Sequence, residues 1–389
     1  MIRRLVFKLL PILLLSVMSV NVFALFDVTP KPLVQVALLD RIYAEAPSLS
    51  KLAAYERAYL AGAKVAKMDA PLYGYRLQYK PFLFGGGPID ILDELPKIKA
   101  WRADVVLGPS SSDECLLLGK YLTSIMVVSS YASDVNIQQR YSNFFSTLLP
   151  DNRIMTMLAH FTHKRFPKKS VFVLMQTDCK QCVDVGKSFI KQYQALSSSN
   201  YVTSKTMFFD HIDQLDIHSL IGPHINDVIF VLTALDLKYN YFARHVANAF
   251  PGKRLTFMSD QDNWGNEGGD TPLTKTDLPY DSYRIGPLLY DRHSALFMQF
   301  YRQYLTLFGK PPTDAVSFET YNSIVSTLVA LNKYPDPGKG DKMHDQILYS
   351  YRHAMKNNPD WFRAKNYGIY LLTSTGEMLV KKMQISHYH

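Results

Sequence analysis

The sequence predicts an α/β protein of two Rossmann-like lobes, each with a parallel central sheet, and an interlobe cleft. Short apolar runs alternate with amphipathic stretches along most of the chain, which is the pattern of parallel strands connected by helices. This series begins a second time near residue 170. Two predicted strands of the first series end in serine-rich turns, and ligands of open α/β sheets bind at the carboxyl ends of strands.

The first 24 residues (1–24) have the features of a secretory signal peptide. Arg3, Arg4 and Lys8 form a positive head, Leu9–Val20 is largely apolar, and Ala24 ends a site with small residues at the positions that a signal peptidase reads. A retained membrane anchor is the alternative, because the apolar stretch approaches spanning length. Its interruption by proline and polar residues favours cleavage, so we expect an exported, periplasmic protein.

The charge of the chain argues against a nucleic-acid partner. The formal net charge is +9, and part of it belongs to the signal segment. The remaining excess is spread along the chain, with no run of five or more basic residues. Nucleic-acid binding normally needs basic residues gathered in a patch or stripe. We therefore expect no nucleic-acid partner.

The first series of elements begins with a strand and continues to a helix after the second serine turn. Short apolar runs bounded by turn residues indicate the strands, and amphipathic stretches indicate the helices. A turn at 85–88 follows the second strand. We predict strands at 33–39, 75–79, 103–107 and 124–128, and helices at 52–67, 89–101 and 154–166.

The second series predicts the other lobe and the return of the chain. We predict strands at 171–175, 205–209, 228–232 and 255–258, helices at 183–196, 239–250, 294–308 and 317–332, and a closing hairpin of 368–373 and 378–383. Hinge crossings are expected near residues 149, 283 and 378. The first lobe would then contain 25–149 plus 283–378, and the second lobe 150–282 plus 379–389.

The two serine-rich turns are the best candidates for a binding site. The segment 108–112 reads GPSSS and the segment 129–133 reads SSYAS. Neutral donors at helix N-termini bind an anion without placing a fixed opposite charge in the cleft. The alternative is that these serines only cap the helices that follow, and capping and binding can coexist.

The chain has three cysteines, and two of them form a Cys-x-x-Cys motif. Cys179 and Cys182 lie at a predicted junction between a strand and a helix. An oxidising compartment favours a structural disulfide. Two free thiols and a redox-active pair are the alternatives, since a helix N-terminus favours a thiolate. Cys115 is expected to be a buried helix residue.

Several segments, by their order and spacing, resemble the type I periplasmic binding proteins, the branched-chain amino-acid and amide receptors of ABC importers. The resemblance covers nearly all of the chain after the signal segment. Its most specific part is the pairing of GPSSS with a second small-residue turn about twenty positions later. The main segments are VQVALLD (34–40), ADVVLGPSSS (103–112), MVVSSYASD (126–134), SVFVLMQTD (170–178) and DVIFVLTALD (227–236).

The resemblance implies that both serine turns hold a ligand carboxylate through hydroxyl and backbone N–H groups. The matching positions in the first turn are Ser112 and its neighbour Ser111. In the second turn they are Ala132 and Ser133. Tyr43, in the loop after the first strand, is a candidate wall of the pocket.

The second lobe departs from the family pattern. Gln181 stands at one position where many members have an aromatic residue, and Ala234 or Leu235 stands at another. A buried ligand ammonium group needs an acidic partner, and Asp260 is the candidate, with Asp262 as a second choice. The alternative is that both are carboxylates of a surface loop. These departures leave the ligand class open.

No enzymatic motif was found that would carry a reaction. The chain has no Gly-x-Ser-x-Gly elbow, and the glycine run at 85–87 lacks the Lys-Ser/Thr of a phosphate loop. His160 and His163 share a helix face but not a His-Glu-x-x-His motif. We expect a monomeric, non-enzymatic solute-binding protein without a cofactor, which delivers a small polar ligand to an inner-membrane permease. The alternative is an envelope regulator or sensor that acts through protein contacts.

Overall fold

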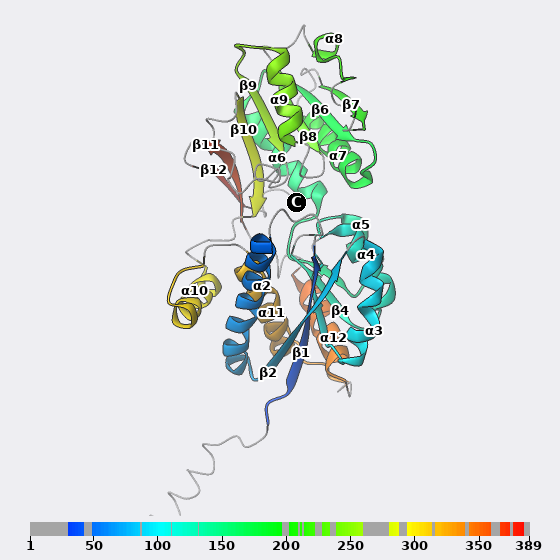
Figure 1. Ribbon diagram of the computed structural model, residues 1–389, viewed down its shortest axis with the longest axis vertical. Helices are drawn as coiled ribbons and strands as arrows, with labels where there is room; N and C mark the ends of the chain where they lie inside the picture. The colour runs from blue at the N-terminus through cyan, green and yellow to red at the C-terminus, as the bar shows by residue number, and fades with distance from the viewer. Residues whose placement is uncertain are drawn as a thin grey trace, which may run out of the picture.

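The computed structural model confirms the predicted α/β class and its two lobes. Figure 1 shows the lobes one above the other along the longest axis of the molecule. A five-stranded sheet forms the core of one lobe and a seven-stranded sheet that of the other. The structure describes residues 30–42, 49–85, 88–109, 111–130, 132–196, 202–208, 211, 214–221, 228–233, 239–259, 280–287, 294–312, 316–338, 342–358, 366–373 and 376–384.

The first lobe is built on a wholly parallel sheet with the order β2-β1-β3-β4-β5. Its three last strands are buried along their whole length, as expected for a parallel sheet covered on both faces. The strands are β1 (Leu33–Ile42), β2 (Arg76–Gly85), β3 (Val105–Leu107), β4 (Met126–Ser129) and β5 (Phe144–Ser146).

Alternate side chains of these strands point to two separate cores. Val36 and Leu38 of β1 pack towards one face and Ala37 and Leu39 towards the other. The first face is covered by α2 (Leu49–Asp69), α10 (Ala295–Phe308), α11 (Val316–Lys333) and α12 (Met343–Asn357). The second face is covered by η2 (Pro88–Asp93), α3 (Leu95–Ala100), α4 (Ser112–Tyr121) and α5 (Val135–Arg140).

A buried carboxylate at the end of α2 ties three helices of the first face together. Asp69 is fully buried and accepts hydrogen bonds from the hydroxyl of Tyr321 (2.6 Å) and the amide of Gln299 (2.8 Å). Tyr321 lies on α11 and Gln299 on α10. The short 3-10 helix η1 (Ala70–Tyr73) follows directly. A buried carboxylate needs such donors, and here they come from α10 and α11.

The second lobe contains a mixed sheet with the order β12-β11-β10-β9-β8-β6-β7. The strands from β7 to β10 in this order run parallel, whereas β11 and β12 form the predicted antiparallel hairpin. The strands are β6 (Ser170–Gln176), β7 (Val202–Met207), β8 (Val228–Thr233), β9 (Leu255–Ser259), β10 (Tyr280–Pro287), β11 (Asn366–Thr373) and β12 (Gly376–Gln384).

Helices cover both faces of the second sheet as well. One core contains Phe172 and Phe230 with the buried side of α9 (Tyr239–Ala249) and the short α8 (Ile217–Ile221). The other contains Val171 and Val173 with α6 (Asp151–Arg165) and α7 (Lys180–Leu196). Among the described residues, no helix combines the length and the apolar character that crossing a membrane requires.

The strand pairing differs from the lobe boundaries expected from the sequence. The crossing expected at residue 283 falls inside β10, and β11 was expected in the first lobe, within 283–378. Both strands belong to the second sheet, because β10 pairs with β9 on one side and with β11 on the other. The return to the first lobe is therefore made by the helices α10 to α12, and α12 itself was not predicted.

Candidate functional site

The carboxyl ends of β3 and β4 lie side by side, and the two serine turns that follow are bonded to each other. Leu107 pairs with Val128 at the end of the ladder. The hydroxyl of Ser129 donates to the carbonyl of Pro109 (2.7 Å), and the N–H of Gly108 donates to the carbonyl of Val128 (2.8 Å). The two serine-rich turns singled out from the sequence therefore lie side by side at the carboxyl end of this sheet.

In the first turn, Ser111 is the N-cap of α4. Its hydroxyl accepts a hydrogen bond from the N–H of Glu114 (3.3 Å), and the Glu114 carboxylate accepts one from the N–H of Ser111 (3.4 Å). This is a capping box, in which two backbone donors at the helix start are satisfied. Ser112 is the first residue of the helix and is partly exposed. The hydroxyl of Ser111 is therefore used to cap the helix, whereas the hydroxyl of Ser112 has no part in the cap.

In the second turn, Ser129 organises the backbone and Ser133 faces the other lobe. The N–H of Ala132 donates to the hydroxyl of Ser129 (3.0 Å), and the Ala132 methyl group is buried in the first-lobe core. Ser133 is 7% exposed. Its carbonyl accepts a hydrogen bond of 3.1 Å from the N–H of Asp151, the first residue of α6.

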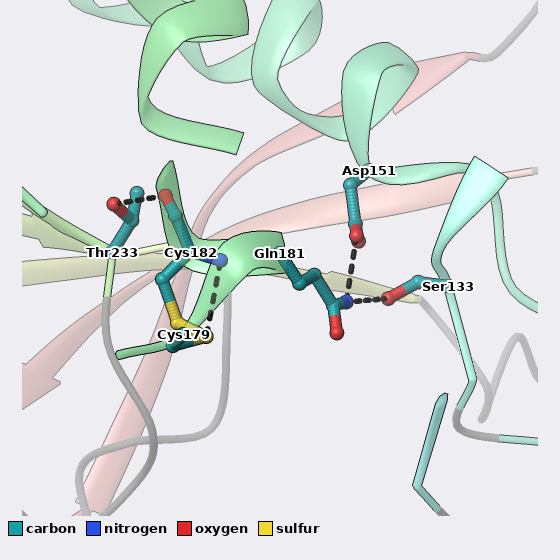
Figure 2. Close-up of a disulfide and its surroundings, with 6 residues drawn as sticks. All are labelled: Ser133, Asp151, Cys179, Gln181, Cys182 and Thr233. Atoms are coloured by element: carbon teal, nitrogen blue, oxygen red, sulfur yellow. Dashed lines mark hydrogen bonds between the residues drawn. A yellow bond between two sulfur atoms is a disulfide. The ribbon is translucent and has the colours of Figure 1, made fainter. Parts of the chain in front are cut away.

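Ser133, Asp151 and Gln181 form a hydrogen-bonded cluster between the lobes (Figure 2). The side-chain amide of Gln181 donates to the carboxylate of Asp151 (2.7 Å) and to the hydroxyl of Ser133 (3.4 Å). Gln181 lies in the first turn of α7 in the second lobe, and Ser133 follows β4 in the first lobe. The structure thus brings together two predicted site residues and adds Asp151, which sequence reasoning missed.

Burial controls the electrostatics of this cluster. Burial raises the pKa of Asp151 from 3.8 to about 6. This effect outweighs that of the hydrogen bonds from Ser133 and Gln181, which lower the pKa. The nearby charge of Asp134 raises the pKa further. A buried carboxylate that receives only neutral donors is held less firmly in its charged form than one beside a cation. The cluster is therefore sensitive to the loss of either donor.

The Cys-x-x-Cys motif forms a disulfide at the start of α7. Cys179 and Cys182 are bonded with their Cα atoms 5.2 Å apart, within the ordinary range for a disulfide. The N–H of Cys182 donates to the sulfur of Cys179 (3.1 Å), and the hydroxyl of Thr233 at the end of β8 donates to the carbonyl of Cys182 (2.7 Å). This pairing agrees with the structural disulfide favoured from the sequence. Figure 2 shows Gln181 pointing from this turn towards Asp151 and Ser133.

The third cysteine, Cys115, does not belong to the cluster. Cys115 is buried on α4, where its thiol donates to the carbonyl of Pro109, and burial raises the pKa of that thiol. Tyr43, Ala234 and Asp260 lie outside the described residues. Within the described part of the chain, no group of His, Cys, Asp and Glu side chains is arranged to hold a metal ion.

Solved structures of binding proteins share this fold. The leucine-binding protein LivK from Thermotoga maritima aligns with a TM-score of 0.68 at 12% identity, over 91% of this chain and 99% of its own. LivJ from Streptococcus pneumoniae, solved with isoleucine, aligns with a TM-score of 0.64 at 12% identity, over 90% of this chain and 99% of its own. A solute-binding protein from Rhodopseudomonas palustris, solved with 3,4-dihydroxybenzoic acid, aligns with a TM-score of 0.62 at 14% identity, over 91% of this chain and 98% of its own.

These similarities establish the fold of the chain and leave its ligand open. No protein-family model and no curated protein sequence matches it. The matched structures are ABC-transporter substrate-binding proteins of the type I periplasmic class, and they span the chain almost from end to end. The two-lobe architecture expected from the sequence is therefore that of type I periplasmic binding proteins.

Proposed function

We propose that this chain is a periplasmic solute-binding protein that captures a small polar ligand between its lobes and presents it to an inner-membrane ABC permease. The proposal assigns no catalytic step, cofactor or nucleic-acid partner to the chain. It includes removal of residues 1–24 as a signal peptide and a monomeric mature protein. An amino acid or a related carboxylate or amide is the ligand class that the serine turns favour.

The meeting of Ser133 and Gln181 is the observation that carries this proposal. One residue follows a strand of the first lobe and the other begins a helix of the second, and both present polar groups at the same place. A ligand that bonds groups of both lobes stabilises the closed arrangement over the open one. Differential affinity of this kind is what shifts a hinge equilibrium.

The proposed ligand contacts divide between the lobes. Ser112 and Ser133 supply neutral hydroxyl donors from the first lobe. Ser111 and Ala132 are retained as proposed contacts beside them, although their own N–H groups bond Glu114 and Ser129 within the chain. Gln181 supplies an amide from the second lobe. Tyr43, Ala234 and Asp260 are retained as proposed contacts on the strength of the sequence alone.

A thermal-shift screen of residues 25–389 tests the proposal. The panel contains amino acids, amides, short peptides and small carboxylates, including isoleucine, leucine and 3,4-dihydroxybenzoate. A compound present at one hundred times its Kd stabilises the native state by about 2.7 kcal/mol, which corresponds to a shift in Tm of a few degrees. A shift that is reduced by Ser133→Ala and by Gln181→Ala would support ligand capture at this site. The absence of any shift across the panel would contradict it.

A protein-binding role is the second candidate, and one observation favours it. The amide of Gln181 bonds Asp151 and Ser133, so that its N–H groups are satisfied by the chain itself. An envelope regulator or sensor would need no small molecule there. If the screen gives no hit, affinity capture from envelope extracts with the mature protein as bait, followed by measurement of binding to the purified partner, tests this role.

A further inference from the structure

We propose that the Cys179–Cys182 disulfide positions Gln181 against Asp151 and Ser133, so that reduction by a dithiol releases this side chain from the site between the lobes. The release itself does not depend on the proposed function. Its consequence, a lower affinity for a ligand, rests on the proposed function of ligand capture between the lobes. The disulfide is thus assigned a role in shaping the site besides its role in the fold.

The backbone on both sides of Gln181 is fixed by covalent and hydrogen bonds. Cys179 is joined to Cys182 by the disulfide, and the N–H of Cys182 also donates to the Cys179 sulfur. The carbonyl of Cys182 accepts a bond from Thr233, which anchors the start of α7 to β8. A four-residue ring that is held in this way leaves the Cα atom of Gln181 little freedom, because closing it removes alternative backbone conformations.

From this fixed backbone position, the side chain of Gln181 reaches two other parts of the structure. Its amide spans from α7 to the first residue of α6 and to the turn after β4. The bond to Asp151 at 2.7 Å is directed at a carboxylate and is the stronger of the two. Without the disulfide, the first turn of α7 frays more readily. Because ordering the Gln181 side chain then costs more conformational entropy, its amide occupies the bonded position less often.

Reduction removes the covalent link between Cys179 and Cys182 that closes this ring. Dithiothreitol breaks the S–S bond by thiol–disulfide exchange. Its two thiols transfer two electrons and two protons, giving two cysteine thiols and the cyclic disulfide of the reagent. Cys179 is 9% exposed and Cys182 is 5% exposed, so alkylation and intact mass must confirm that both thiols have formed.

Hydrogen exchange measured by mass spectrometry on residues 25–389 tests the proposal without a ligand. The reporter is the amide of Asp151, which donates to the carbonyl of Ser133. We expect this amide to exchange at least fivefold faster after reduction, while the amides of β8 stay within twofold. Gln181→Ala in the oxidised protein should reproduce the increase, and reduction of that variant should add less than twofold. Gln194→Ala, an exposed glutamine of the same helix, should leave the amide unchanged.

Two results would overturn the proposal. One is a fully reduced protein in which the Asp151 amide exchanges within twofold of its oxidised rate. The other is faster exchange that extends into β8, which would mean that the disulfide only stabilises the lobe. If the disulfide resists reduction, the Cys179→Ser/Cys182→Ser variant takes the place of the reduced protein, and the same limits apply to it.

A separate measurement concerns the ligand. For the compound that gives the largest thermal shift in the screen, we expect Kd to rise at least fivefold on reduction of the native protein and less than twofold in Gln181→Ala. An unchanged Kd would contradict the link between the disulfide and binding. If no compound binds, the proposed function fails, and hydrogen exchange still decides the positioning role.

Discussion

The backbone N–H of Leu149 donates a hydrogen bond of 2.9 Å to the hydroxyl oxygen of Tyr367, and both residues are completely buried. Leu149 lies just before α6, where the chain passes from the first lobe to the second. Tyr367 lies in β11, with which the chain returns to the second sheet. One hydrogen bond therefore connects two segments that link the lobes, although 218 positions separate them in the sequence.

Replacement of this tyrosine tests how much the connection contributes. Tyr367→Phe keeps the ring and leaves the N–H of Leu149 buried without its acceptor, which typically costs about 1–3 kcal/mol. Urea unfolding should show a lower free energy of unfolding by that amount. Tyr121→Phe, at a tyrosine that is 42% exposed, should change it by less than about 0.5 kcal/mol. Equal stabilities of the two variants would contradict a stabilising role for the hydrogen bond between Leu149 and Tyr367.

The close approach of α2 to α11 makes Gly62 a second sensitive position. A Cβ atom there would fall on the carbonyl oxygen of Ser317 and lie 2.8 Å from the Cβ of Thr320. Alanine favours a helix by up to about 1 kcal/mol over glycine, but backbone atoms cannot yield without separating the two helices. Gly62→Ala should therefore destabilise the protein by about 1–3 kcal/mol in urea unfolding.

Gly85→Ala is the matched control for this prediction. A Cβ atom at Gly85 meets no other atom within 4 Å, so this variant should stay within about 0.5 kcal/mol of the native protein. A Gly62→Ala protein as stable as the control would show that α2 and α11 separate easily.

The buried carboxylate of Asp151 predicts a particular dependence of stability on pH. Its pKa in the folded protein is about 6, compared with an ordinary value of 3.8, and desolvation is the main cause. Between these two values the folded state binds more protons than the unfolded state. The contribution of Asp151 to stability is therefore present near pH 4 and is lost as the pH rises through 6.

Asp151→Asn removes this titration and keeps an oxygen that can accept from Gln181. Relative to the native protein, the variant should gain about 1–3 kcal/mol in unfolding free energy between pH 4 and pH 7.5. Urea unfolding at several pH values measures this difference. Parallel stability curves for the two proteins would show that Asp151 titrates at its ordinary pKa.

The class of fold was predictable because its signals are local. Val34, Val36 and Leu38 repeat at the period of a strand, and buried parallel strands such as Met126–Ser129 read as short apolar runs. The helix at Met343–Asn357 was missed. Its exposed charged residues, Asp345, Arg352 and Lys356, interrupt the apolar pattern, and two of the five residues that it buries are a serine and a tyrosine.

The lobe boundaries and Asp151 were not predictable, since both depend on contacts that are distant in sequence. The place of β11 is decided by its pairing with β10, and nothing in either segment specifies that partner. Asp151 reads in the sequence as an acidic residue at a helix start. Only the folded chain places Ser133 and Gln181 beside it.

The two serines at the start of α4 should separate capping from binding. Ser111 is engaged by the capping box with Glu114, so Ser111→Ala should lower the unfolding free energy by about 0.5–2 kcal/mol. Ser112 is not the cap, and Ser112→Ala should change stability by less than about 0.5 kcal/mol.

For the compound that gives the largest thermal shift, Ser112→Ala should raise Kd about tenfold, the equivalent of one lost hydrogen bond of 1.4 kcal/mol. Ser111→Ala should raise it less than threefold. Calorimetric titration of both variants measures Kd, and urea unfolding measures stability. If Ser112→Ala alters neither quantity, the first turn serves the fold alone and the ligand contacts lie with Ser133 and Gln181.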